Sequence, residues 1–260
     1  CQDGTRPTSR RDPLRNQPLT AILVIFSAFS TWTAEAKLST RVIYGDDNRR
    51  DYFDVPDADW RQRADATVAL IRDASLDPAG SLTNIKTVAY GQSMGLCTSE
   101  PFYSQETAAF CSGFLVSPDT IVTAGHCVRS QSSCESTRFV FGFKLAASNA
   151  QPRSVATDMV FNCQRLVHSV ASPNGEDFAV VKLDRPVTHV APLVYRKSGR
   201  PSEGDPLIVM GHPSGLPLKL ADGANVRKVN PEFLVANLDT YGGNSGSGVF
   251  NGTTGEIEGI

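Results

Sequence analysis

A serine near the end of the printed sequence has the setting of a reactive nucleophile. Ser245 lies in the stretch TYGGNSGSGVF, with glycine at positions 242, 243 and 246. A serine hydroxyl is a weak nucleophile by itself. It needs a base to take its proton, a group that orients the base, and hydrogen-bond donors for the oxyanion that develops. The rest of the sequence offers candidates for all three partners.

The best candidate for the base is His126, which follows an apolar run in TIVTAGHC. Cys111 and Cys127 bracket two short predicted strands, so a disulfide between them would clamp the turn that carries this histidine. The other three histidines, interpreted as packing or solvent-facing residues, are His168, His189 and His212. No HxxxH, HxH or CxxC spacing is present, so we expect no metal site and no cofactor.

The orienting acid is predicted to be Asp177, the first residue of the apolar run DFAVVKL. At the start of a strand that is shielded from water, the charge of a carboxylate interacts strongly with a neighbouring imidazole. The adjacent Glu176 lies further into the loop and is the weaker candidate. The oxyanion donors are predicted to be the backbone N–H groups of Gly243 and Ser245. The glycines give this backbone the conformational freedom that such an arrangement requires.

These residues lie in a part of the chain that is dominated by short strand-like runs. From about residue 86 the runs include CSGFLV, TIVTA, RFVFGF, FAVVKL, PLIVMG and SGVF, separated by Gly, Pro, Ser and Asn. Many short strands with turn residues between them favour an antiparallel barrel or sandwich. The polar segment 195–206 is predicted to join two such units.

An earlier segment, 57–74, has the spacing of an amphipathic helix. Trp60, Ala64, Val68 and Ile71 recur at helical intervals, and Asp57 is placed to cap the start. We therefore predict a helix over DADWRQRADATVALIRDA.

The first 36 residues are interpreted as upstream residues followed by a secretory signal peptide. Arg15 supplies a positive charge, residues 19–29 form an apolar run, and AEA at 34–36 fits a cleavage site. We expect a secreted or periplasmic bacterial protein that is no longer in the membrane after cleavage.

Of six cysteines, Cys1 then falls outside the mature region. Five remain, so one is either free or paired beyond Ile260; Cys134 with Cys163 is a guess at a second bridge.

The stretches TAGHC, DFAVVKL and GGNSGS, in this order, resemble the chymotrypsin-fold serine peptidases. GNSGS, IVMGHPSGLPLK and VIYGDDNR are similar to the bacterial branch that includes the glutamyl endopeptidases. The resemblance implies an all-β fold of two antiparallel six-stranded β-barrels with the active site between them. It also implies that His126 is the general base, that Asp177 orients it, and that Ser245 is the nucleophile. The Gly243 and Ser245 amides would form the oxyanion hole.

On this basis the chain divides into four parts. Residues 1–36 precede the mature protein, and 37–85 form an N-terminal segment with a possible short propeptide, a first strand and a helix. Residues 86–194 form the first barrel, with His126 and Asp177. Residues 195–260 form the second barrel, with Ser245. We expect this second barrel to be truncated, because fifteen residues after Ser245 cannot supply its last strands.

Two positions depart from the family pattern. Asn244 stands where trypsin-like animal enzymes have an Asp that pairs with a newly cut N-terminus, so we expect that activation switch to be absent. Gly248 stands where the family usually has Pro, and a turn accepts either.

Substrate selectivity has two interpretations. Asp239, six residues before Ser245, has the offset of the trypsin specificity acid and favours Lys or Arg at P1. Thr240 instead matches a hydroxyl position of the glutamyl pocket, which accepts acidic side chains. Lys/Arg is our first choice and acidic P1 the alternative.

The expected function is that of a secreted, monomeric serine endopeptidase acting on protein or peptide substrates. An alternative of another class is a non-catalytic binding module on the same fold. An esterase is disfavoured, because GNSGS runs into a strand rather than a helix. The formal net charge is −2 and no basic run carries interleaved aromatics, so we expect no nucleic-acid partner.

Overall fold

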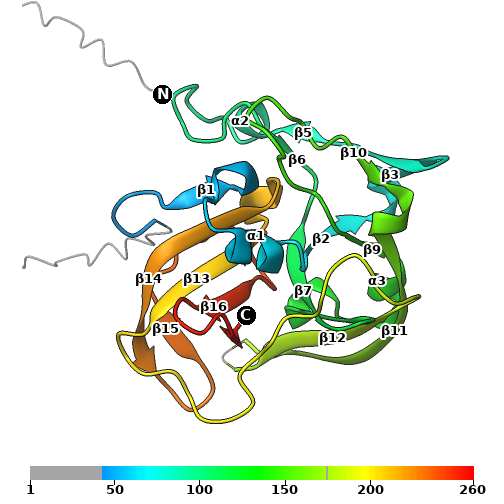
Figure 1. Cartoon of the computed structure of the whole chain (residues 1–260). Helices are drawn as coiled ribbons and strands as arrows, with labels where there is room; N and C mark the ends of the chain where they lie inside the picture. The colour runs from blue at the N-terminus through cyan, green and yellow to red at the C-terminus, as the bar shows by residue number, and fades with distance from the viewer. Residues whose placement is uncertain (1–42, 174) are drawn as a thin grey trace, which may run out of the picture. The chain divides into compact units, whose positions relative to one another are not determined.

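The computed structural model describes residues 43–173 and 175–260. Strands dominate this part of the chain (Figure 1). The predicted signal peptide and its cleavage site lie outside the described residues. Among the described residues, no helix has the length and apolar character needed to cross a membrane.

Six antiparallel strands close into a barrel. They are β2 (Thr67–Arg72), β7 (Cys111–Ser117), β8 (Thr120–Thr123), β9 (Thr137–Val140), β11 (Val160–Ala171) and β12 (Asp177–Leu183), joined in the order β11-β12-β8-β7-β2-β9. The barrel interior is filled by large apolar side chains that are almost fully buried, including Leu70, Leu115, Ile121, Phe139 and Phe161. Closure leaves no unpaired strand edge along the barrel, which suits an antiparallel all-β unit.

Six further strands form a second antiparallel sheet beside the barrel (Figure 1). They are β1 (Arg49–Asp51), β13 (Pro206–Gly211), β14 (Lys219–Val229), β15 (Leu234–Ala236), β16 (Gly248–Asn251) and β17 (Ile257–Gly259). The order is β1-β14-β13-β16-β17, and β15 pairs with β14. The expected all-β fold is confirmed, and one antiparallel six-stranded barrel is present. Within the described residues the second unit is an open sheet and does not close into a barrel.

The predicted helix over 57–74 is correct for its first half and wrong for its second. Helix α1 (Ala58–Ala64) begins after Asp57, whose carboxylate accepts hydrogen bonds from the backbone N–H groups of Asp59 and Trp60. From Thr67 the chain is strand β2, paired with β7 on one side and β9 on the other. The run TVAL is buried on both faces, so the helical spacing of Val68 and Ile71 was coincidental.

The remaining elements are short and lie around these two sheets. A three-stranded sheet contains β3 (Leu76–Ala79), β4 (Leu82–Ile85) and β10 (Ser154–Ala156), and β5 (Val88–Ala89) pairs with β6 (Glu106–Thr107). Helices α2 (Tyr90–Ser93) and α3 (Gln131–Glu135) are single turns, and 3₁₀ turns occur at Tyr52–Asp54, Asp73–Ser75, Gly125–Cys127, Thr157–Met159 and Pro213–Gly215.

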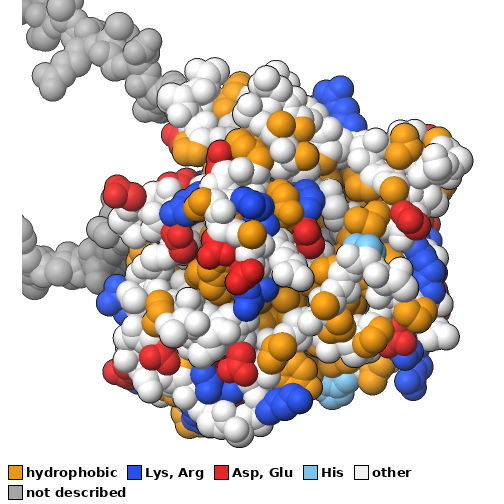
Figure 2. All heavy atoms as spheres, in the orientation of Figure 1, with side chains coloured by type: hydrophobic (Ala, Val, Ile, Leu, Met, Phe, Trp, Pro, Cys, Tyr) orange, Lys and Arg blue, Asp and Glu red, His pale blue; other side chains and the backbone are white. Residues whose placement is uncertain are grey.

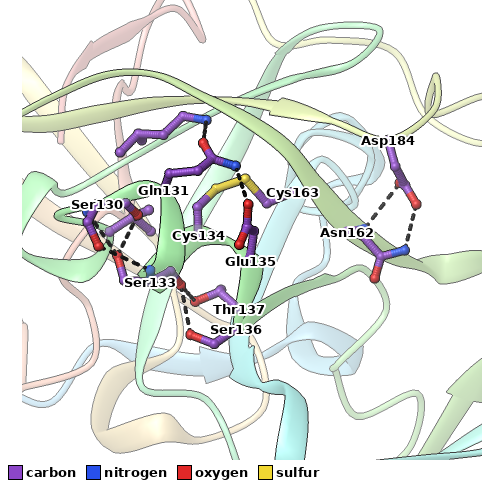
Figure 3. The surroundings of a disulfide bond; sticks show 12 residues. Ser130, Gln131, Ser133, Cys134, Glu135, Ser136, Thr137, Asn162, Cys163 and Asp184 are labelled. Atoms are coloured by element: carbon purple, nitrogen blue, oxygen red, sulfur yellow. Dashed lines mark hydrogen bonds between the residues drawn. A yellow bond between two sulfur atoms is a disulfide. The ribbon is translucent and has the colours of Figure 1, made fainter.

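A disulfide fixes α3 against the barrel. Cys134 in α3 is bonded to Cys163 in β11, which confirms the second bridge guessed from the sequence (Figure 3). Beside it, the side chain of Gln131 accepts the Leu166 backbone N–H at 2.8 Å and donates to Glu135 at 2.9 Å. No cysteine among the described residues is a free thiol.

The described surface carries charges of both signs. Figure 2 shows Lys and Arg side chains interspersed with Asp and Glu, with apolar side chains between them, across one face of the molecule. This face therefore has no large area of a single charge.

Candidate active site

His126 and Asp177 meet at the ends of two neighbouring barrel strands. β12 pairs with β8, with Ala179 opposite Thr123, so the start of β12 lies beside the turn that follows β8. One oxygen of the Asp177 carboxylate lies 2.6 Å from Nδ1 of the His126 ring, and the other accepts the His126 backbone N–H at 2.8 Å. The carboxylate therefore fixes both the ring and the turn that carries it.

The electrostatics of this pair favour an ionised carboxylate. Partial burial raises the pKa of the Asp177 carboxyl, but the hydrogen bonds from the ring and backbone of His126 lower it by more. The net result is a pKa below the usual range for aspartate. A charged acceptor at Nδ1 holds the proton on that nitrogen and leaves Nε2 free to act as a base.

Ser245 comes to the same place from the second sheet. It lies in the loop between β15 and β16, and it lines an open cavity of about 810 Å³ together with His126 and Asp177. Within the described residues its hydroxyl makes no hydrogen bond. Nucleophile–base contacts are often loose without substrate and tighten when it binds.

The backbone around Ser245 is arranged so that two N–H groups remain unused. The carbonyl of Gly242 accepts a hydrogen bond from Ser214 N at 2.5 Å. All described peptide bonds are trans, so the Gly243 N–H on that same peptide points the opposite way. In the described part of the chain, neither Gly243 N–H nor Ser245 N–H donates a hydrogen bond. These are the two donors that the sequence predicted for an oxyanion.

Two glycines of this loop have conformations that other residues rarely adopt. Gly243 has φ of +94° and Gly246 has φ of +85°. A Cβ on Gly246 would also lie 2.2 Å from the carbonyl oxygen of Ser112 in the barrel, closer than any real contact. Close approach of the loop to the barrel therefore requires glycine at 246.

The Cys111–Cys127 disulfide is present, as predicted. It joins the first residue of β7 to the residue that follows His126. The predicted clamp on this turn is therefore part of the structure.

Cys111, His126 and Cys127 also form a cluster with ligand atoms within 4.8 Å, but both sulfurs are used in the disulfide, so they are not thiolate ligands for a metal.

Asp239 is not brought to the cavity. Its side chain is buried, and its two oxygens accept the backbone N–H groups of Tyr44 at 2.8 Å and Asn48 at 3.1 Å. Neither Asp239 nor Thr240 lines the cavity that contains Ser245. In this structure Asp239 anchors the N-terminal segment, which sequence offset alone did not reveal.

The cavity has a wall that the sequence analysis missed. Residues 196–201, 230–234 and 257–260 line it, including Lys197, Arg200, Glu232 and Phe233. These residues carry no motif, and they are far apart in the sequence, so only the folded structure brings them together.

The other histidines do not join the cavity. His168 and His189 are exposed, as predicted, and pack on phenylalanine rings. His212 is buried, and its Nδ1–H donates to the Leu216 carbonyl at 3.0 Å. Burial lowers the pKa of His212 to about 4, so its ring is neutral at pH 7.

Residues 111–260 match a protein family described as "Trypsin-like peptidase domain". The matched range is more than half of the chain and contains His126, Asp177 and Ser245. Among curated proteins, the thrombin-like enzyme acutin of Deinagkistrodon acutus is 28% identical over 185 residues, covering 59% of this chain and 73% of that protein.

Three solved structures that match this chain share little of its sequence. The Vibrio cholerae VesB protease superimposes with a TM-score of 0.52 at 17% identity, covering 82% of this chain and 59% of that chain. Human heparin binding protein gives 0.50 at 14% identity, covering 76% and 79%. A Glu endopeptidase in complex with MPD gives 0.48 at 20% identity, covering 84% and 85%.

Proposed function

Because this chain belongs to the trypsin-like peptidase domain family, it is a serine protease, and we propose that Ser245, His126 and Asp177 are its catalytic triad. The observation that carries this assignment is the hydrogen bond from His126 to Asp177 at 2.6 Å on the cavity that Ser245 also lines. Acid and base are held by the barrel, and the nucleophile is held by the second sheet.

The chemistry follows from this arrangement. His126 Nε2 takes the Ser245 hydroxyl proton as the Ser245 oxygen bonds to the scissile carbonyl carbon. The N–H groups of Gly243 and Ser245 stabilise the negative charge that develops on the carbonyl oxygen. The proton then passes to the leaving amine as the C–N bond breaks. A water molecule repeats these steps on the acyl-enzyme and releases the acid.

The assignment is tested by comparing the wild-type protein with Ser245→Ala. We expect a fluorophosphonate probe to label the wild-type protein at Ser245 and to leave the variant unlabelled. Peptide hydrolysis should be lost in parallel. The control is Ser136→Ala, an exposed serine at the end of α3, which should keep both properties. Labelling at another serine, or no labelling of a folded wild-type protein, would contradict the assignment and favour a binding module.

A Lys/Arg preference through Asp239 requires the carboxylate to release the Tyr44 and Asn48 amides. An acidic P1 preference is instead supported by Lys197 and Arg200 on the cavity wall, although Glu176 and Glu232 line the same cavity. A peptide library varied at P1, tested with wild type and Asp239→Asn, separates these alternatives. Cleavage after Lys or Arg that is lost in the variant supports Asp239 as the specificity acid. Cleavage after Glu in both proteins supports the acidic alternative.

We also propose that the protein acts outside the cytoplasm, on protein or peptide substrates. The support is the pair of disulfides, Cys111–Cys127 and Cys134–Cys163, since such bonds persist in oxidising compartments. Measuring the mature N-terminus and the location of the expressed protein tests this proposal. Accumulation of the unprocessed chain in the cytoplasm would contradict it.

A further inference from the structure

Ser112 joins the barrel to the loop that carries the nucleophile. It is the second residue of β7, next to Cys111, and it is fully buried. Its hydroxyl donates to the carbonyl of Gly243 at 2.9 Å, and its backbone N–H donates to the carbonyl of Ser245 at 2.8 Å. One residue of the barrel therefore makes two hydrogen bonds to the loop.

The direction of the hydroxyl hydrogen bond is fixed by a third partner. The backbone N–H of His212 donates to the Ser112 hydroxyl oxygen at 2.9 Å. The oxygen accepts this hydrogen bond, so the hydroxyl proton remains available for the Gly243 carbonyl. A buried hydroxyl that both donates and accepts has a defined orientation.

These bonds complete a pattern that covers four successive carbonyls of the loop. Gly242 O accepts from Ser214 N at 2.5 Å, and Asn244 O accepts from Ser247 N at 2.8 Å. The other two carbonyls of this run accept hydrogen bonds from Ser112: its hydroxyl donates to Gly243 O, and its backbone N–H donates to Ser245 O. With every carbonyl from 242 to 245 directed at a protein donor, the orientation of each peptide group is set.

We propose that Ser112 is a positioning residue for catalysis: its side chain holds the Gly243 carbonyl so that the N–H groups of Gly243 and Ser245 stay directed at the oxyanion. The Gly243–Asn244 peptide lies between the two peptide groups that carry these N–H donors. Without the hydroxyl, rotation of this peptide would turn one or both donors away. The inference rests on the proposed roles of Ser245 and Gly243. Loss of one oxyanion donor costs about 10²–10³ in kcat.

The test compares Ser112→Ala with the wild-type protein. We expect kcat per folded molecule to fall about 10- to 100-fold, less than for complete loss of a donor, while KM changes little. Affinity for a peptide boronate, which forms a tetrahedral adduct, should fall in parallel with kcat. Ser112→Thr keeps the hydroxyl and should restore a large part of kcat.

The matched control is Thr137→Val, which removes another fully buried hydroxyl that donates to a backbone carbonyl, Ser133 O, at 2.8 Å. This variant should lose similar stability in urea unfolding and keep wild-type kcat. If the folded Ser112→Ala protein keeps kcat within twofold, or if boronate affinity and KM change equally, the inference is wrong. If Ser112→Ala does not fold, Ser112→Cys takes its place, because a thiol is a weaker hydrogen-bond donor than a hydroxyl. The folded Cys variant should then show lower kcat and lower boronate affinity than the wild-type protein, and unchanged values of both would overturn the inference.

The proposed function and this inference fail in different ways. A wild-type protein without Ser245-dependent hydrolysis contradicts the proposed function itself. A wild-type protein with that activity, combined with an unaffected Ser112→Ala variant, contradicts only the role of Ser112.

Discussion

At the scale of single residues, Asp177 and Ser245, the proposed acid and nucleophile, are held in different ways. One carboxylate oxygen of Asp177 accepts a hydrogen bond from the His126 ring, and the other accepts one from the His126 backbone N–H. The carboxylate therefore opposes both rotation and displacement of the imidazole. Ser245 is held through its backbone carbonyl, while its hydroxyl is unbonded within the described residues. The hydroxyl is therefore free to turn towards the base when a substrate arrives.

Replacing the carboxylate of Asp177 with an amide tests its role. We expect Asp177→Asn to lower kcat by about 10⁴-fold, because the amide no longer holds the imidazole in the tautomer with Nε2 free. The measurement is kcat at pH 7 for both proteins, with Asp184→Asn as a control at an exposed carboxylate of the same barrel. A fall of less than tenfold would show that His126 does not depend on Asp177.

The buried His212 predicts a specific pH dependence of stability. Its pKa is about 4 in the folded protein, against 6.5 for an unperturbed histidine. The unfolded chain therefore binds more protons between these values, and stability falls as pH drops from about 6.5 to about 4. The contribution is about 3 kcal/mol at about 1.4 kcal/mol per pKa unit.

Urea unfolding at pH 7 and pH 4 should show this loss in the wild-type protein and a smaller loss in His212→Asn. The exposed His168→Asn should behave as wild type. Equal pH dependence in wild type and His212→Asn would mean that another group is responsible.

Single residues also show where sequence reasoning succeeds and where it stops. His126 and Asp177 could be proposed as partners of Ser245 because each carries distinctive chemistry at a strand end, and the three residues line one cavity. Asp239 was interpreted as the specificity acid from its offset to Ser245 alone. In the structure its carboxylate accepts hydrogen bonds from the backbone N–H groups of Tyr44 and Asn48. Ser112 was missed, because a small polar residue in a strand has no signature until its partners are known.

At the scale of elements, the start of β7 assembles the candidate site. Cys111 clamps the turn after β8 that carries His126, and Ser112 holds the loop after β15 that carries Ser245. The elements themselves were predictable where turn residues separate short apolar runs. β2 was not, because the run after Ala64 matches both helical spacing and a buried strand, and pairing with β7 and β9 decides between them.

The two disulfides are expected to differ in their effect on activity. Removing the Cys111–Cys127 bridge, which spans 16 residues, should cost about 3 kcal/mol, and removing Cys134–Cys163, which spans 29, about 4 kcal/mol. Paired Cys→Ala variants test this in urea unfolding and kinetics. Only the Cys111→Ala, Cys127→Ala protein should also lose kcat when folded, because His126 lies in its clamped turn. Equal kcat values in the two folded variants would contradict the clamp.

At the scale of the whole molecule, the N-terminal segment ties the parts of the described structure together. β1 pairs with β14, and Asp51 at its end forms a buried ion pair with Lys219 at 2.5 Å. Gln105 bridges the two, donating to Asp51 and accepting from Lys219, both at 2.8 Å. Three distant segments thus share one buried polar cluster.

Breaking this cluster from one side should be costly. Lys219→Met leaves the Asp51 carboxylate buried without its cation, and we expect a loss of about 3–5 kcal/mol in urea unfolding. The double variant Lys219→Met, Asp51→Leu should be less destabilised than the single one, because no unpaired charge remains. Lys182→Met, which removes a half-exposed ion pair with Asp119, is the control and should cost about 1 kcal/mol or less. A Lys219→Met protein as stable as this control would contradict the buried ion pair.

The alternation of side chains along β7 has a consequence for how the length of this chain can vary. Cys111 and Ser112 are neighbours whose side chains leave the strand on opposite faces, one towards the His126 turn and one towards the Ser245 loop. Shifting β7 by one residue against its neighbouring strands would exchange the faces and break both connections at once. Length changes are tolerated best at surface turns such as 80–81, between β3 and β4, and least inside β7. Proteins descended from this sequence should therefore differ in length at the turn between β3 and β4 and keep the length of β7.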